Sequence, residues 1–187
     1  QHISFHLRDS LPKSALDLLK AELANLPEDR KKQQRQLKYH ALLDSGYGSC
    51  ILRHPEAAQI VQNALLHFDG ERYRLRAWVV MPNHVHALIQ TVPGFHMAKI
   101  VQSWKSFTAR RINAWMDVEG ECRAGARRSE DSARRGIWQR DYWDRYIRDD
   151  EHFQTVIRYI EGNPVKAGLV SSPEEWRWTS VQWRSRR

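Results

Sequence analysis

Residues 73–90 read Tyr-Arg-Leu-Arg-Ala-Trp-Val-Val-Met-Pro-Asn-His-Val-His-Ala-Leu-Ile-Gln. Residues 73–80 and 84–90 are each rich in the β-branched, aromatic and other apolar side chains that strands favour. Between them, Met81-Pro82-Asn83 carries two residue types that favour turns. The stretch therefore predicts two strands separated by a tight turn.

Apolar periodicity predicts the elements on either side of this stretch. Residues 2–7 alternate apolar and polar side chains, which predicts a short strand. Helices are predicted to begin near Pro12 and at Pro55, and to cover residues 97–116 and 149–162, the last one ending at Asn163-Pro164. Residues 28–38 are charged and rich in Gln, which predicts a solvated helix or a linker.

Composition limits the class of protein. The chain has 187 residues, of which 41% are hydrophobic and 28% charged, and a net charge of +8. This size predicts a single soluble domain over residues 1–187, with a flexible insertion at 119–136 and a basic C-terminal tail at 176–187. No apolar run reaches the length of a membrane span, and two cysteines without a CxxC pattern fit a reducing cytoplasm. The positive charge favours a nucleic-acid partner.

His84 and His86 are the first candidates for chemistry. Side chains two residues apart in a strand point to the same face, so these two imidazoles project together while Val85 points away. Two imidazoles on a rigid strand can begin a divalent-metal site. The alternative is a chance pair of surface or core histidines.

Tyr159 and Asn163 form the second candidate pair. They lie four residues apart at the end of a predicted helix and can share one face. A tyrosine hydroxyl, with a pKa near ~10, needs a metal or a cation to act as a nucleophile at neutral pH. An amide oxygen of Asn163 could complete a metal shell. The alternative is a half-buried tyrosine followed by an asparagine that caps the helix.

Basic and aromatic residues gather in two further segments. Arginines bind phosphates and aromatic faces stack on unpaired bases, although core packing is the alternative for any single tryptophan. The first segment contains Trp104, Lys105, Arg110 and Arg111, and the second contains Trp138, Arg140, Tyr142, Trp143, Arg145, Tyr146 and Arg148. Together they predict a DNA-binding surface.

Several of these motifs match one known family in the same order along the chain. They are Met-Pro-Asn-His-Val-His at 81–86, Trp104-Lys105, Trp138-Gln139, Asp144-Arg145, Ile147-Arg148, and Tyr159-Ile160 followed by Asn163-Pro164-Val165-Lys166-Ala167-Gly168-Leu169-Val170. In this respect the chain resembles the Y1 transposases of IS200/IS605-type elements, and most closely their REP-associated branch. The resemblance covers the whole chain and is strongest over residues 73–178.

The resemblance implies an α+β, ferredoxin-like fold with an antiparallel sheet and helices packed on one face. It also implies the HUH class of active site, in which two histidines flank a hydrophobic residue, here His84, Val85 and His86. The nucleophile would be Tyr159, and Asn163 would join the histidines in holding Mg²⁺ or Mn²⁺. Tyr142 and Tyr146 are competing nucleophiles that lie outside the tyrosine motif.

The implied activity is cleavage and rejoining of single-stranded DNA beside a hairpin, through a 5′-phosphotyrosine. The expected partner is a short palindromic element with an adjacent single strand, and a monomer is favoured over a dimer that exchanges its tyrosine helix. Residues expected to contact DNA are Trp104, Lys105, Arg110, Arg111, Arg140, Arg145, Arg148 and Lys166.

Two other functions remain open from the residues. A hairpin-binding protein without turnover would explain the charge and the aromatic residues. A metal-dependent hydrolase that uses water would tolerate loss of Tyr159, and the lack of a carboxylate cluster near the motifs argues against it. The transposase hypothesis makes a geometric prediction: His84 and His86 lie within reach of the Tyr159 helix, in one chain or across two subunits.

Overall fold

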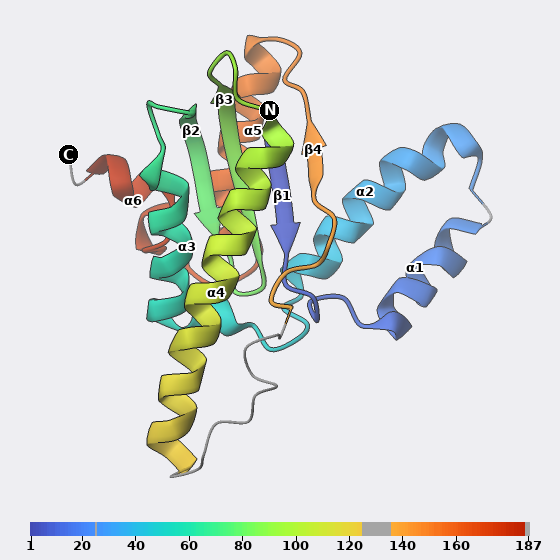
Figure 1. The fold of residues 1–187 in the computed structure, drawn as a ribbon. Helices are drawn as coiled ribbons and strands as arrows, with labels where there is room; N and C mark the ends of the chain where they lie inside the picture. The colour runs from blue at the N-terminus through green and yellow to red at the C-terminus, as the bar shows by residue number, and fades with distance from the viewer. Residues whose placement is uncertain (25, 125–135, 186–187) are drawn as a thin grey trace.

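A computed structural model describes residues 1–24, 26–124 and 136–185. Its centre is a four-stranded sheet with the strand order β2-β3-β1-β4 (Figure 1). The strands are β1 (His2–His6), β2 (Tyr73–Val80), β3 (His84–Thr91) and β4 (Trp143–Arg145). The strands predicted at 2–7, 73–80 and 84–90 are confirmed.

All pairs of neighbouring strands are antiparallel, with β3 and β1 in the middle of the sheet. Met81-Pro82-Asn83 joins β2 to β3 at one end of this sheet, where Val80 pairs with Val85. On β1, Ser4 lies opposite His86 and His6 lies opposite His84. The α+β class with a ferredoxin-like antiparallel sheet is therefore confirmed.

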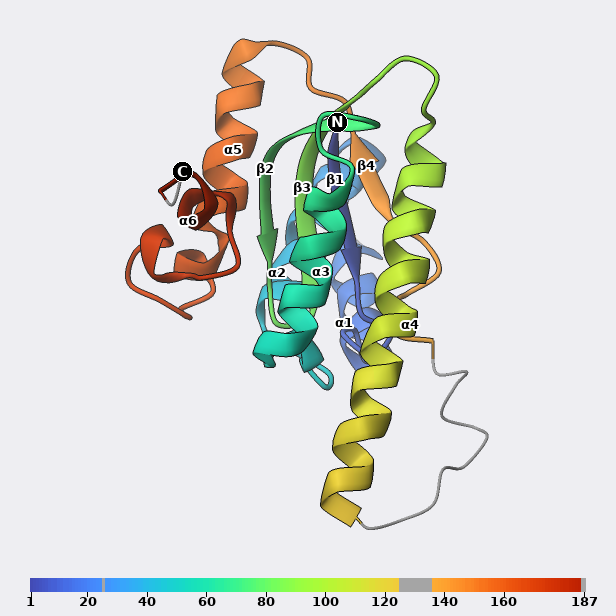
Figure 2. The same cartoon turned by 60° about the vertical axis from the view of Figure 1, so that its left-hand side comes forward.

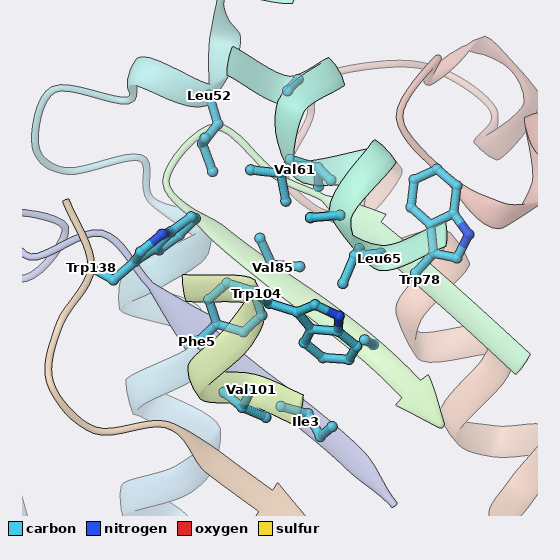
Figure 3. Close-up of a cluster of buried hydrophobic side chains, with 14 of the residues drawn as sticks. Ile3, Phe5, Leu52, Val61, Leu65, Trp78, Val85, Val101, Trp104 and Trp138 are labelled. Carbon is cyan, nitrogen blue, oxygen red and sulfur yellow. The ribbon is translucent and has the colours of Figure 1, made fainter. Parts of the chain in front are cut away.

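One face of the sheet is covered by α3 (Pro55–His67) and α4 (Met97–Ala124). Figure 3 shows the core between them, in which Phe5 and Val85 of the strands meet Leu65 of α3 and Trp104 of α4. Pro55 starts α3 because a proline at the first helical position loses no hydrogen bond. The resemblance implied helices packed on one face of the sheet; α3 and α4 take that position, whereas α5 packs on the opposite face.

The opposite face carries α5 (Asp150–Lys166), seen on the other side of the sheet from α3 and α4 in Figure 2. Val156 and Ile160 of α5 pack on Val79 and Leu88 of the strands. The helix α2 (Glu28–Asp44) ends near the same face. Together with α1 (Lys13–Ala24) it forms a helical pair that projects beyond β4 in Figure 1. Residues 28–38 are thus helical.

Two helices end later than the sequence predicts. α4 continues past Met116 to Ala124, so the first part of the insertion expected at 119–136 is helical, and residues 125–135 lie outside the described residues. α5 continues through Pro164 to Lys166. Pro164 has no backbone N–H to donate, but the backbone N–H groups of Ala167 and Leu169 still bond back to Asn163 and Pro164 and close the last turn.

The C-terminal segment packs along β2. After η3 (Pro173–Glu175), the backbone N–H of Val80 donates to Trp178 O at 2.9 Å, and Trp176 Nε1 donates to Val80 O at 3.0 Å. The helix α6 (Ser180–Ser185) follows, and residues 186–187 lie outside the described residues. The basic tail predicted at 176–187 therefore packs along the edge of β2 over residues 176–185. No helix in the described part of the chain is long and apolar enough to cross a membrane.

Candidate active site

His84 and His86 lie side by side on the face of β3 that α3 and α4 do not cover. Both side chains are fully buried, and their ring centroids are 4.9 Å apart. Strand alternation places them here, because Val85 between them belongs to the apolar core on the other face. The neighbouring strand β1 adds His2, whose ring centroid is 5.2 Å from that of His86.

α5 brings Tyr159 and Asn163 to the same place within one chain. The ring centroids of Tyr159 and His86 are 5.4 Å apart, and the Asn163 side chain is fully buried. The sequence placed the end of the helix before Asn163. Because α5 in fact continues to Lys166, Tyr159 and Asn163 lie one turn apart inside a regular helix and share its inner face.

α2 contributes two site residues that the sequence reasoning missed. The ring centroid of His40 is 5.4 Å from that of His86, and Asp44 Oδ1 is 3.6 Å from His84 Nε2. Lys166 of α5 binds the other Asp44 oxygen at 2.8 Å. The sequence did contain a signal for these two residues. A histidine and an aspartate lie four residues apart, with the apolar Leu43 between them, just after the segment 28–38 that was predicted to be solvated.

Asn83 fixes which nitrogen of His84 faces the site. Its amide Nδ2 donates to the carbonyl oxygens of Leu43 and Tyr47, both at 3.1 Å, so its Oδ1 can only accept. His84 Nδ1 lies 2.8 Å from that oxygen and must carry the proton. In the neutral ring, Nε2 therefore holds a free lone pair, which is the form that binds metals.

His86 is oriented in a similar way by β1. Its Nδ1 and His2 Nε2 are 3.2 Å apart, a bond in which one of the two nitrogens donates. The other nitrogen of His86, Nε2, is directed away from His2. A hydrogen bond at the far nitrogen is the usual support of a metal-binding histidine.

Burial keeps these histidines neutral. Burial, together with the nearby basic groups, lowers the pKa of His2 and of His84 to about 3 and that of His40 to about 4. The pKa of His86 is also lowered well below its usual value, first by burial. Burial, with the nearby Asp44 carboxylate, raises the pKa of Tyr159. The site is thus rich in lone pairs and holds a protonated phenol.

Seven buried polar atoms at this site have no hydrogen-bond partner among the described residues. They are His40 Nδ1, Asp44 Oδ1, His84 Nε2, His86 Nε2, Tyr159 Oη, Asn163 Oδ1 and Asn163 Nδ2. Buried polar atoms are normally paired, so a group of orphans indicates a place for an ion or a ligand. In the described ranges no group of three or more His, Cys, Asp or Glu side chains could hold a metal ion. A cation at this place would therefore need the Asn163 amide as a ligand.

A cavity of about 350 Å³ lies beside the site, between α2 and residues 139–143. His40 and Trp143 line the cavity, and their ring centroids are 5.5 Å apart. His40 also lies next to His86, and Trp143 lies next to His2. Its remaining lining residues are Ser4, His6, Arg35, Gln36, Tyr39, Gln139, Asp141 and Tyr142. Aromatic rings, amides and one arginine suit a nucleotide.

The structure corrects two expected DNA contacts. Trp104 is 3% exposed and its Nε1 donates to the Tyr73 hydroxyl at 3.0 Å, so it is a core residue and cannot stack on a base. Lys105 donates to the carbonyl oxygens of Gln139 and Arg140, both at 2.7 Å. Its ammonium group therefore holds the segment that forms one wall of the cavity, and burial lowers its pKa.

The other expected DNA contacts are exposed but lie in different places. Arg110 and Arg111 are on α4, on the side of the sheet away from the histidines. Arg140, Arg145 and Arg148 are exposed in and around β4, and Lys166 is exposed at the end of α5 beside Asp44. The geometry thus separates a basic surface close to the site from a pair of arginines behind it.

Comparison with known proteins gives the site a context. The family described as "Transposase IS200 like" matches residues 33–163, a range that contains β3 and most of α2 and α5. An Escherichia coli protein named REP-associated tyrosine transposase is 25% identical over 65% of this chain and 63% of its own length. A Haemophilus influenzae protein assigned to the same group is 30% identical over 54% of each chain. The chain therefore spans about half to two thirds of these relatives.

A solved structure supports the fold. It is described as a REP-associated tyrosine transposase bound to a REP hairpin, and it covers 100% of this chain with a TM-score of 0.53. The shared portion is 78% of that chain, at 19% sequence identity. At this identity the likeness concerns the arrangement of strands and helices.

Proposed function

The chain belongs to the IS200-like transposase family, and from this premise we propose that it cleaves and rejoins single-stranded DNA through a covalent link to Tyr159. The observation that carries the proposal is the convergence of His84, His86, Tyr159 and Asn163 within one chain. Each has a buried polar atom with no hydrogen-bond partner among the residues that the structure describes. An active site for phosphoryl transfer needs such uncommitted groups, whereas a purely structural cluster would pair them.

His84 Nε2, His86 Nε2 and the Asn163 oxygen would hold Mg²⁺ or Mn²⁺. When bound, the cation would polarise the scissile phosphate and offset the charge that develops on it. Around it, this chain's own residues set the geometry: Asn83 and His2 hold the two imidazoles, and α5 holds Tyr159 beside them. Tyr159 of the same chain is in reach, which supports a site that is complete in a monomer.

The covalent step begins at the Tyr159 hydroxyl. Its oxygen forms a bond to phosphorus while the bond to the 3′ oxygen breaks, which leaves a 5′-phosphotyrosine and a free 3′-OH. Because its pKa is raised, the hydroxyl must give its proton to a base, and the neutral His40 ring lies 6.2 Å away between centroids. A second 3′-OH can then attack the phosphotyrosine and restore Tyr159. The number of phosphodiester bonds is conserved, so no nucleotide triphosphate is required.

The proposed substrate is single-stranded DNA next to a hairpin, in the cytoplasm. The relatives named as REP-associated transposases, and the hairpin in the solved structure, support this choice. The exposed Arg140, Arg145 and Arg148 would bind the backbone, and the cavity beside His40 would accept an unpaired nucleotide.

The experiment uses a labelled hairpin with single-stranded flanks, Mn²⁺ and the full chain. We expect a covalent protein–DNA species that survives denaturation, and its loss in Tyr159→Phe. Tyr146→Phe is the matched control because Tyr146 is exposed and lies outside both the site cluster and the cavity, and it should still form the adduct. An equal yield from Tyr159→Phe would contradict the proposal.

A hairpin-binding protein without turnover is the second candidate. The buried Tyr159, protonated and without a partner, is also what an inactive relative would retain. Such a protein would bind the same hairpin with strong salt dependence but give no covalent species with any metal. A water-using hydrolase would instead release free 5′-phosphate ends and keep its activity in Tyr159→Phe.

A further inference from the structure

The segment 176–185 joins the edge of the sheet to the tyrosine helix. Ser180 is 4% exposed, and its Oγ takes part in two hydrogen bonds. It accepts from the backbone N–H of Trp78 at 3.1 Å and donates to Glu161 Oε1 at 2.7 Å. Arg184 of α6 binds the same carboxylate oxygen at 2.5 Å. Because Trp78 belongs to β2 and Glu161 to α5, one serine hydroxyl links strand and helix, and Figure 2 shows α6 beside α5.

Glu161 and Tyr159 lie on opposite sides of α5. Consecutive residues of an α-helix are turned by ~100°, so two residues correspond to a turn of roughly 200°. The Tyr159 ring faces His86, whereas the Glu161 side chain, 13% exposed, faces the segment 176–185. A hydrogen bond weakens once its donor and acceptor are more than ~3.2 Å apart. The bond to Ser180 therefore resists both rotation of α5 and its movement away from the sheet.

The turn of α5 that carries the site residues is weak on its own. Gly162 follows Glu161 directly, and a glycine inside a helix is less stable than an alanine. Pro164 has no backbone N–H to donate to the turn before it. Packing does not require the glycine, since an added Cβ would meet no atom of the described structure within 4 Å. The turn from Tyr159 to Asn163 thus depends on contacts from outside the helix.

We propose that Glu161 and Ser180 are positioning residues for the transfer step, which hold the turn from Tyr159 to Asn163 against the histidines. The inference rests on the proposed function, because it concerns the same step. It gives a role to a segment that contains neither the histidine motif nor the tyrosine motif. The Tyr159 oxygen must approach phosphorus to within about 3.5 Å, and a misplacement of about 1 Å can slow a reaction ~10²-fold. Loss of the link should therefore slow transfer without weakening DNA binding.

The test compares the rate of adduct formation with the affinity for the hairpin, using the full chain and Mn²⁺. With saturating hairpin, Glu161→Ala and Ser180→Ala should each form the adduct at least about tenfold more slowly. The Kd for the hairpin, from fluorescence anisotropy, should stay the same. Glu28→Ala is the matched control, because Glu28 is an exposed glutamate on α2 that pairs with Lys31, and it should change neither quantity. Rates are compared at a temperature at which circular dichroism shows each variant folded.

Two further variants separate positioning from a general loss of stability. Glu161→Gln keeps an oxygen that can accept from Ser180, so it should retain most of the rate that Glu161→Ala loses. Gly162→Ala, added to Glu161→Ala, strengthens the helix from within and should restore part of the rate. If neither variant were faster than Glu161→Ala, the role of the link in positioning would be contradicted.

Hydrogen exchange of the DNA-free protein tests the link without relying on activity. In Ser180→Ala, the backbone N–H groups of Tyr159 and Asn163 should exchange at least about tenfold faster, while that of His84 in β3 keeps its rate, because only the helix turn is released. Normal exchange together with a normal adduct rate would overturn the inference and leave the proposed function standing. If the unaltered chain formed no adduct, both proposals would fall.

Discussion

The two faces of the same sheet are built on opposite principles. On the face toward α3 and α4, buried polar atoms are paired: Trp104 Nε1 donates to the Tyr73 hydroxyl, and Trp138 Nε1 donates to Thr108 Oγ1 at 2.9 Å. On the face toward α5, His84 Nε2, His86 Nε2, Tyr159 Oη and the Asn163 amide have no hydrogen-bond partner in the described part of the chain. Adjacent residues of β3 belong to different faces, so one strand serves both.

This difference separates stability from chemistry. The paired, apolar face buries most of the large side chains and supplies the free energy of folding. The other face retains buried atoms whose desolvation is not compensated, which costs ~1–3 kcal/mol for each such group. Buried groups that lower stability in this way are retained where function requires them. Substitutions on the two faces should therefore have opposite effects on stability and activity.

The largest effect is expected at His86. His86→Ala removes a proposed ligand, and we expect the yield of covalent protein–DNA adduct with Mn²⁺ to fall by at least about 10²-fold, because electrostatic stabilisation of the transition state is lost. Some stability is lost as well, because the substitution leaves a buried cavity and removes the partner of His2 Nε2, so the yield is compared at a temperature at which the variant is folded. The adduct is measured by denaturing electrophoresis over time. Adduct formation at the normal rate would remove His86 from the site.

Leu65→Ala should lower the free energy of unfolding and leave metal binding unchanged. Leu65 is fully buried against the paired face, and its truncation leaves a cavity that costs ~2–5 kcal/mol. The free energy of unfolding is measured by urea denaturation, with His86→Ala as the comparison from the other face. At temperatures where Leu65→Ala is folded, its Mn²⁺ affinity should be normal. A large loss of metal affinity would mean that the faces are coupled.

Acid should destabilise the site face selectively. The pKa values of His2 and His84 (about 3) and of His40 (about 4) are below the unfolded value of 6.5, so the unfolded chain binds protons that the folded chain excludes. Their contribution to stability is complete above pH 6.5 and is lost as pH falls toward 4 and then 3. The slope is up to about 1.4 kcal/mol per pH unit for each histidine.

Urea denaturation from pH 7 to pH 5 measures this loss. Leu65→Ala retains the histidines, so its free energy of unfolding should be lower at every pH but should fall with pH by the same amount. A flat profile over this interval would show that folding does not lower the pKa values of these histidines.

Tyr159→Phe should raise stability while it abolishes the adduct. The substitution removes a buried hydroxyl that has no partner, so we expect the DNA-free protein to gain about 1 kcal/mol, or a few degrees in Tm. Calorimetry measures the change, and Tyr142→Phe, outside the site cluster, is the comparison. A marked destabilisation would indicate that the Tyr159 hydroxyl is engaged in the folded protein.

The smallest effect should distinguish the two groups of arginines. Arg140→Ala, near the cavity, should weaken hairpin binding and reduce the salt slope by about 1, as loss of one phosphate contact does. Arg110→Ala, on α4 behind the sheet, should change neither. Fluorescence anisotropy at several salt concentrations measures both. Equal effects would place DNA on both sides of the sheet.

The sequence was informative where periodicity is local and less so where long-range packing decides. The two strands around Met81-Pro82-Asn83 and the shared face of His84 and His86 followed from alternation alone. The role of Trp104 did not, because the sequence does not show which side of α4 meets the sheet. Nor did the contribution of Asp44, which depends on how a long, polar helix approaches a strand forty residues away. Pro164 was read as a helix end, but packing of α5 on β2 sustains the last turn.

The central claim is that Tyr159 is the residue that joins DNA. The most direct measurement is proteolysis of the covalent species formed with a hairpin substrate and Mn²⁺, followed by mass spectrometry of the peptide that carries the nucleotide. The account predicts a 5′-phosphate linked to Tyr159 and to no other residue. A nucleotide on Tyr142 or Tyr146, or cleaved DNA with free 5′-phosphate ends and no modified peptide, would contradict it.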